Sequence, residues 1–369
     1  MKAQAAGSPG NTRAVSGSFQ PISLPQAISR ISRRIAAKAY RHLSITHRQS
    51  IPPILARARV PCYQTLTGPV SDAAQLDPPM QNWRLTLSYD GTGFSGWQIQ
   101  PGERTVQGEL QAALRRVTGE SPLPQGSGRT DAGVHALGQV ASFELQANIP
   151  PDNLLRALNR TLPAAIRILD ARTARSAFHA RHSTIAKTYE YRVFRCAICP
   201  PFLAPYVYAC SWPMDMDLLQ RSAGMFVGEH DFLSFAATDP DLAARKLAAR
   251  RGLGENPANP GPGDRAGSLP ALANLFKPGK HGAVRTIFFS AWEQRHTEDG
   301  EVLIYRVRGN GFLHHMVRNL VGTMLDVGRG YTDIEAIQGM LAARSRDAAG
   351  PTAPAHGLFL HSVDYPINE

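Results

Sequence analysis

The chain has 369 residues, of which 43% are hydrophobic and 19% charged, so it can build packed cores, and its length suggests about two domains at roughly 150 residues each. Four cysteines are too few for a disulfide scaffold and fit a reducing compartment, and no run approaches the roughly 18 apolar residues of a membrane span. The formal net charge of +11, from 40 Lys and Arg against 29 Asp and Glu, is typical of a nucleic-acid-binding protein.

That charge is concentrated at the N-terminus. Residues 1–71 hold ten Lys or Arg and no Asp or Glu, which leaves 30 − 29 = +1 for the rest of the chain. We expect residues 1–79 to be a disordered basic extension. Three origins fit it: an organellar transit peptide, a basic tail with nonspecific RNA affinity, or a start assigned too far upstream of Met80. The first makes the protein organellar, and the others leave it cytoplasmic.

A first α+β unit is predicted between residues 80 and 180. Its segments alternate between the two-residue period of a strand and the apolar stripe of a helix. The expected elements are a strand at 84–90, a helix at 105–117, a strand at 138–143, a helix capped by Asp152 and ending at 162, and a strand from 166 to 169.

A second α+β unit is predicted over residues 181–369, beginning with a strand near Lys187. Residues 238–281 are rich in Ala, Gly and Pro, which predicts a disordered insertion. The other expected elements are a helix at 216–226, strands at 283–292 and 302–308, helices at 314–327 and 332–343, and a closing strand at 359–365. The fold class is therefore α+β.

Gly91, Gly93 and Gly96 form a G-x-G-x-x-G pattern after a strand. A dinucleotide site requires that the third glycine opens a helix, but Pro101 and Gly102 interrupt any helix here. We therefore interpret the pattern as a turn that carries an aromatic side chain, and a nicotinamide oxidoreductase is the disfavoured alternative.

Two patterns resemble metal sites but lack a full set of ligands. Cys196 and Cys199 have only Cys210 as a further sulfur nearby, so buried free thiols are expected rather than zinc. His314 and His315 are adjacent, and on a helix their side chains diverge by about 100°. They make a poor chelating pair, and no metal site is expected.

The glycine-rich segment at 126–135 is the strongest candidate for chemistry. It contains one carboxylate, Asp131, in a loop whose small residues allow close contact with a ligand. A loop aspartate also commonly caps backbone amides, so both roles stay open on the residues alone. Ser127 with His135 lacks the G-x-S-x-G elbow of a hydrolase.

Residues 128–135, Gly-Arg-Thr-Asp-Ala-Gly-Val-His, resemble the signature loop of the tRNA pseudouridine synthase A family. Further blocks follow in the family's order and extend the resemblance over residues 83–366. They are Asp-Gly-Thr at 90–92, Gly-Trp-Gln at 96–98, Thr-Val-Gln-Gly-Glu-Leu at 105–110, Phe-His-Ala-Arg at 178–181, Lys-Thr-Tyr-Glu-Tyr at 187–191, Gly-Glu-His-Asp-Phe at 228–232, Phe-Leu-His-His-Met-Val-Arg-Asn at 312–319 and His-Gly-Leu at 356–358.

The resemblance implies a fold of two RRM-like (ferredoxin-like) halves, whose antiparallel sheets join into one platform over a central active-site cleft. It implies an isomerase that converts uridine to pseudouridine at positions 38, 39 and 40, in the anticodon stem-loop of tRNA. The implied partners are tRNA and a second copy of the chain in a homodimer. No cofactor and no metal are implied.

Four site residues follow from the resemblance. It implies that Asp131 is the catalytic carboxylate, which attacks C1′ or C6 or removes the 2′ proton, and that Tyr189 stacks on the flipped uridine. Arg129 is expected to fill the vacated stack or to hold a flanking phosphate. Arg318 stands in an otherwise apolar helix, so we expect it to pair with Asp131 and to favour the ionised carboxylate.

The clearest basic stretch outside the N-terminus is expected to contact phosphates. It contains Arg172, Arg175, Arg181, Lys187 and Arg192 against the single acidic residue Glu190. The competing class is an RNA-binding module without chemistry. Such a module would keep its function when Asp131 is replaced by Asn, whereas an isomerase would lose turnover.

Overall fold

The strands in the described part of the chain form one ten-stranded sheet. The computed structural model describes residues 80–237 and 282–367, so the expectations for 1–79 and for the 238–281 insertion lie outside the described residues. The strands are β1 (Gln81–Tyr89), β2 (Gln125–Gly126), β3 (His135–Leu145), β4 (Ile166–Thr173), β5 (Ala186–Arg195), β6 (Tyr208–Ala209), β7 (Gly228–Asp231), β8 (Val284–Thr297), β9 (Gly300–Gly309) and β10 (Leu358–Asp364).

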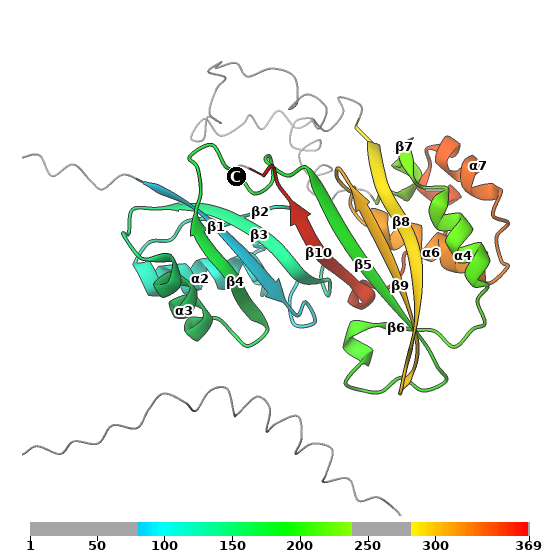
Figure 1. The fold of residues 1–369 in the computed structure, drawn as a ribbon, viewed down its shortest axis with the longest axis horizontal. Coiled ribbons are helices and arrows are strands. Elements are labelled where there is room, and N and C mark those ends of the chain that lie inside the picture. Colours follow the sequence, from blue (N-terminus) through cyan, green and yellow to red (C-terminus); the bar gives the residue numbers. More distant parts are fainter. Residues whose placement is uncertain (1–79, 238–281, 368–369) are drawn as a thin grey trace, which may run out of the picture. The chain divides into compact units, whose positions relative to one another are not determined.

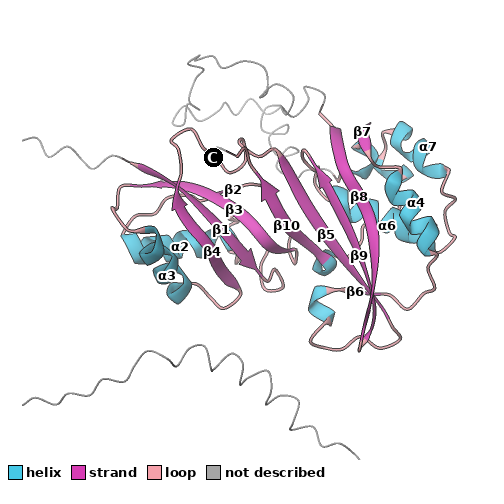
Figure 2. Ribbon diagram, viewed as in Figure 1, coloured by secondary structure: helices cyan, strands magenta, loops and turns pink. Residues whose placement is uncertain are grey.

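Their order in space is β4-β1-β3-β10-β5-β9-β8-β7, with β2 beside β3 and β6 beside β5 (Figures 1 and 2). All pairings are antiparallel except β10 with β3 and β5 with β6. The last described strand thus lies in the middle of the sheet. It joins the strands that precede residue 180 to those that follow it.

Helices flank the two ends of this sheet. The α-helices are α2 (Val106–Thr118), α3 (Pro151–Thr161), α4 (Met216–Gly224), α6 (Met316–Gly328) and α7 (Ala336–Ala343), and short 3-10 helices lie at Ala204–Tyr206, Leu233–Phe235, Arg346–Ala348 and Ala355–Gly357. In Figure 1, α2 and α3 lie by β1 and β4, whereas α4, α6 and α7 gather near β7 and β8. The predicted α+β class is confirmed. The predicted boundary between two halves near residue 180 stays a prediction.

Local sequence explains how these helices begin and which face they bury. The Thr105 side chain caps α2 by accepting from the backbone N–H of Gly108, and Gly119 ends the helix at φ 81°, a conformation that suits glycine. Leu110 and Leu114 of α2 are fully buried. Helix α6 is buried nearly all round, as its apolar sequence predicts.

Three expected helix starts are wrong. Helix α3 begins at Pro151 without a side-chain cap, so Asp152 lies inside its first turn instead of capping it. Helix α6 begins at Met316 rather than at 314, because His315 adopts a left-handed φ of 59° that a helix does not continue through. Helix α7 begins at Ala336 rather than at 332, after turns at Asp333 and Ile334.

Within the ranges 80–237 and 282–367, no helix is both long and apolar enough to cross a membrane.

Candidate active site

The loop that carries Asp131 rests on the glycine-rich turn at residues 91–97. The backbone N–H of Trp97 donates to the carbonyl of Thr130 at 3.0 Å, and that of Gly133 donates to the carbonyl of Phe94 at 3.3 Å. A Cβ at Gly96 would lie only 2.6 Å from the Thr130 carbonyl oxygen, so the close approach requires glycine there. The G-x-G-x-x-G pattern therefore supports a second loop, and no helix follows it until Val106.

Two further contacts hold the same loop from the sheet. The Tyr89 hydroxyl lies 2.8 Å from Oγ1 of Thr130, and Nζ of Lys187 donates to the carbonyl of Ser127 at 2.6 Å. A Cβ at Gly128 would lie 2.8 Å from the Lys187 nitrogen, so the lysine lies directly against the loop backbone. Strands β1 and β5, which are separated in sequence by about a hundred residues, thus both fix the position of Asp131.

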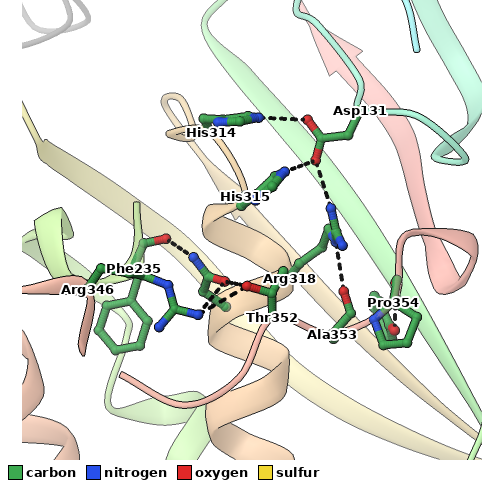
Figure 3. A network of polar contacts seen from close by, with 11 residues as sticks. Asp131, Phe235, His314, His315, Arg318, Arg346, Thr352, Ala353 and Pro354 are labelled. Carbon is green, nitrogen blue, oxygen red and sulfur yellow. Dashed lines mark hydrogen bonds and ion pairs between the residues drawn. The ribbon is translucent and has the colours of Figure 1, made fainter. Parts of the chain in front are cut away.

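Asp131 meets Arg318, as the sequence predicts. Nη1 of Arg318 donates to Oδ2 of Asp131 at 3.2 Å, and the two side chains are 15% and 23% exposed, respectively (Figure 3). Arg318 is the third residue of α6, so the pair joins a loop before β3 to a helix 187 residues further along the chain. The arginine places a full positive charge beside the carboxylate, in a position where little water screens it.

Two histidines also face Asp131, which sequence reasoning did not predict. Nε2 of His314 lies 3.4 Å from Oδ1 of Asp131, and Nε2 of His315 lies 3.2 Å from Oδ2 (Figure 3). The expectation that these side chains diverge is wrong, because both residues precede α6 and the left-handed backbone at His315 turns the two rings to one side. Burial lowers the pKa of His315, while the charge of Asp131 opposes the shift.

A segment at residues 350–354, which we call the strap, fixes the orientation of Arg318. Nε of Arg318 donates to the carbonyl of Ala353 at 2.7 Å. Oγ1 of Thr352 donates to Oδ1 of Asn319 at 2.6 Å, and Nη2 of Arg346 lies 3.1 Å from the same hydroxyl (Figure 3). Asn319 is fully buried and in turn donates to the Phe235 carbonyl at 2.7 Å. Arg318 is therefore held by a strap that a polar network fixes in turn.

The other two predicted site residues differ in exposure. Tyr189 lies on β5 with 8% of its surface exposed, in edge-to-face contact with Phe312 at 5.0 Å between ring centroids. Burial raises the pKa of Tyr189, and the nearby Tyr89 and the charge of Asp131 raise it further. Arg129 is exposed beside Asp131 in the loop. The catalytic and binding roles of all four residues stay predictions.

His135, the last residue of the signature loop, supports the backbone around it. It is buried, and its Nδ1 accepts from the backbone N–H of Gly91 at 3.0 Å, so in this tautomer Nε2 faces the carbonyls of Pro205 and His356, each at 3.1 Å. Burial lowers the pKa of His135. Ser127 instead donates to Gln139 at 2.6 Å, so Ser127 and His135 form no hydrolase pair.

The cysteines and the basic stretch agree with their sequence interpretation only in part. The expected burial is wrong for Cys196, which is exposed, and for Cys199, which is half-buried, and Cys210 alone of these three is buried. Arg172, Arg175 and Arg181 have exposed side chains, whereas Lys187 donates to the Ser127 carbonyl and Arg192 pairs with Glu190, so phosphate contact by this stretch stays a prediction.

Comparison with known proteins gives consistent matches. The family model described as tRNA pseudouridine synthase matches residues 86–183 and 275–366. The chain is 44% identical over 287 residues to tRNA pseudouridine synthase A of Solibacter usitatus, which covers 78% of this chain and all of that protein. It is 40% identical to the enzyme of the same name from Halalkalibacterium halodurans, over 76% of this chain and 91% of that one. It is 39% identical to tRNA pseudouridine synthase A 1 of Desulfotalea psychrophila, over 78% of this chain and all of that protein.

Proposed function

This chain belongs to the tRNA pseudouridine synthase family, and on that basis we propose that it isomerises uridine to pseudouridine at positions 38, 39 and 40 of the tRNA anticodon stem-loop, with Asp131 as the essential carboxylate. The observation that supports the proposal most is the position of Asp131. It is the carboxylate of the family-like loop, and it meets an arginine and two imidazoles contributed by the opposite part of the chain.

The reaction makes and breaks few bonds. The N1–C1′ bond of uridine breaks, the uracil rotates, and C5 bonds to C1′. The proton then leaves C5, its electron pair restores the C5–C6 double bond, and N1 gains a proton. Atoms and charge balance within the nucleotide, so the proposal needs one group that stays beside both fragments. We assign that role to Asp131, with Arg318 balancing its charge.

The uridine must leave its stack before Asp131 can reach it. We propose that the flipped base lies against Tyr189, whose ring contacts Phe312, two residues before His314. Arg129, exposed beside Asp131, would take the vacated place in the stack or hold a phosphate. The exposed arginines at 172, 175 and 181 would contact the backbone of the stem.

The test is site-resolved mapping of pseudouridine in tRNA before and after incubation with the protein. New pseudouridine at positions 38–40 supports the proposal, and modification elsewhere would contradict the assigned site. Asp131→Asn should abolish turnover while tRNA binding persists. A variant that keeps both would instead indicate another catalytic group.

The same proposal includes two copies of the chain in the working enzyme and a cytoplasmic location, as the family resemblance implies. Mass measurement of the purified protein in solution, with and without tRNA, tests the first part. A monomer that modifies tRNA at full rate would contradict it.

A further inference from the structure

Three side chains at the candidate active site hold possible metal ligands close together. Asp131 Oδ1 lies 3.4 Å from His314 Nε2, and Asp131 Oδ2 lies 3.2 Å from His315 Nε2. One ligand atom from each residue lies within 4.8 Å of the other two. This is the only such group of three found among the residues that the structure describes.

These separations suit a small transition-metal ion. Zinc binds imidazole nitrogen and carboxylate oxygen at about 2.0–2.2 Å, and tetrahedral geometry at that length separates its ligand atoms by roughly 3.3–3.5 Å. The two imidazole nitrogens lie beside different oxygens of the carboxylate, 3.4 Å from Oδ1 and 3.2 Å from Oδ2, so Asp131 would bind the ion through both oxygens. Two imidazoles with one carboxylate also favour zinc, cobalt or nickel over magnesium and calcium, which prefer oxygen ligands.

The backbone holds the two histidines in this arrangement. His315 has a φ of 59°, in the left-handed region that a residue other than glycine rarely adopts. The two rings consequently lie 4.0 Å apart between centroids, tilted by 37°. The side chains of Asp131, His314 and His315 are 23%, 30% and 28% exposed, so an ion can reach them from solvent and keep a fourth position for water.

Two features limit the affinity. Arg318 already donates to Oδ2 of Asp131, so a metal ion must share the carboxylate with a positive charge. Nδ1 of His314 is buried and, among the described residues, has no acceptor that would fix its ring for a metal ion. We therefore expect reversible binding in the micromolar range, weaker than that of a structural zinc.

We propose that Asp131, His314 and His315 form a binding site for a divalent transition-metal ion such as Zn²⁺, and that the bound ion inhibits the enzyme. The ion occupies the carboxylate lone pairs that the proposed isomerisation uses, and it fills space beside the uracil. The inhibitory part rests on the proposed function, whereas the binding part depends only on the geometry.

Calorimetric titration with Zn²⁺ tests the binding. The full-length protein carries Cys196→Ser and Cys199→Ser, which removes two accessible thiols that would bind zinc themselves. In this background His314→Gln and His315→Gln should each raise the Zn²⁺ dissociation constant about tenfold or more. The matched control is His296→Gln, on the exposed part of β8, which should leave the constant unchanged. Equal zinc affinity in all three variants, with melting curves that show they are folded, would overturn the proposal.

Activity measurements separate this inference from the proposed function. With the metal-free enzyme, pseudouridine formation should fall as Zn²⁺ is added and recover on chelation, while Mg²⁺ at the same concentration should not inhibit. Activity that Zn²⁺ leaves unchanged would overturn the inhibitory part and leave the proposed function intact. A metal-free enzyme without any activity on tRNA would instead contradict the proposed function, and the zinc titration would still decide the binding.

Discussion

Arg318 and Ala353 are joined by two reciprocal hydrogen bonds. The backbone N–H of Ala353 donates to the Arg318 carbonyl at 3.1 Å, and the Arg318 side chain returns a bond from Nε to the Ala353 carbonyl at 2.7 Å. The first bond anchors the strap to α6, and the second aims the guanidinium at Asp131. The geometry of the carboxylate therefore depends on a segment that does not itself touch it.

Replacing Asp131 with Asn removes the charge at nearly constant volume. We expect pseudouridine formation to fall roughly a thousandfold or more, because no second carboxylate among the described residues pairs with Arg318. Turnover is measured on tRNA, and binding is measured separately by a filter or fluorescence assay, where little change is expected. Asp170→Asn, an exposed aspartate on β4, is the matched control. Turnover of Asp131→Asn within tenfold of the parent would refute the assignment.

Arg318→Lys keeps the positive charge but loses the fork that reaches both Asp131 and Ala353. We expect kcat to fall by about tenfold to a hundredfold, and further in Arg318→Met, because a lysine offers one donor point where the arginine offers two. The control is Arg308→Lys, whose surface pair with Asp364 should leave kcat within about twofold. If Arg318→Lys and Arg308→Lys lower kcat equally little, the two-donor guanidinium of Arg318 is not needed for turnover.

Gly322 of α6 provides a test of the strap. Its missing side chain makes room for the Pro351 carbonyl, with which a Cβ would collide. Gly322→Ala should therefore destabilise the protein by about 1–3 kcal/mol and lower kcat, since it pushes the strap away from Arg318. Gly339→Ala in α7 meets no neighbouring atom and should stabilise it by roughly 0.5–1 kcal/mol. Denaturant unfolding gives the change in the free energy of unfolding for both variants. If Gly322→Ala also stabilises the protein, the strap can move without cost and the prediction is wrong.

Thr352 holds the strap from its other side. Thr352→Val has a similar shape but removes the hydroxyl between Asn319 and Arg346, which should cost about 1–3 kcal/mol because Asn319 is fully buried. We expect kcat to fall with little change in KM. Thr352→Ser, which keeps the hydroxyl, should restore both the stability and kcat. A loss of stability without a loss of kcat would restrict the network to a structural role.

Lys187 gives a pH-dependent stability. Burial lowers the pKa of Lys187 to about 8, and the charges of Arg181 and Arg285 contribute. In the unfolded chain the lysine stays protonated up to about 10.4. Between these values the unfolded state binds more protons, so stability should rise with pH. The melting temperature of the parent relative to Lys187→Met should therefore increase between pH 7 and pH 10, and a constant difference would contradict this.

Much of the fold was predictable because its signals are local. Alternating polarity located β1 and β5, and the stripe of α2 and the apolar α6 located helices that pack as expected. The central position of β10 was not predictable, because hydrophobic alternation identifies a strand but not its neighbours.

The candidate site likewise has features that the sequence predicted and features that it did not. The pairing of Asp131 with Arg318 followed from the family resemblance and from a lone arginine in a largely apolar helix, and the contact is confirmed. The sequence prediction wrongly put His314 and His315 inside the helix. A left-handed residue at the start of a helix has no sequence signature unless it is glycine or asparagine. The supporting contacts of Lys187, Thr352 and Ala353 arise only when distant segments meet.

The central position of β10 has a consequence for biosynthesis. A ribosome releases β1, β3 and β5 long before residues 358–364, yet β10 is the strand that bridges β3 and β5. A nascent chain cannot complete the sheet, or bring the loop before β3 into its final register with α6, until the last strand has left the exit tunnel. Incomplete chains that end before β10 should therefore carry Asp131, Tyr189 and Arg318 and still leave tRNA unmodified.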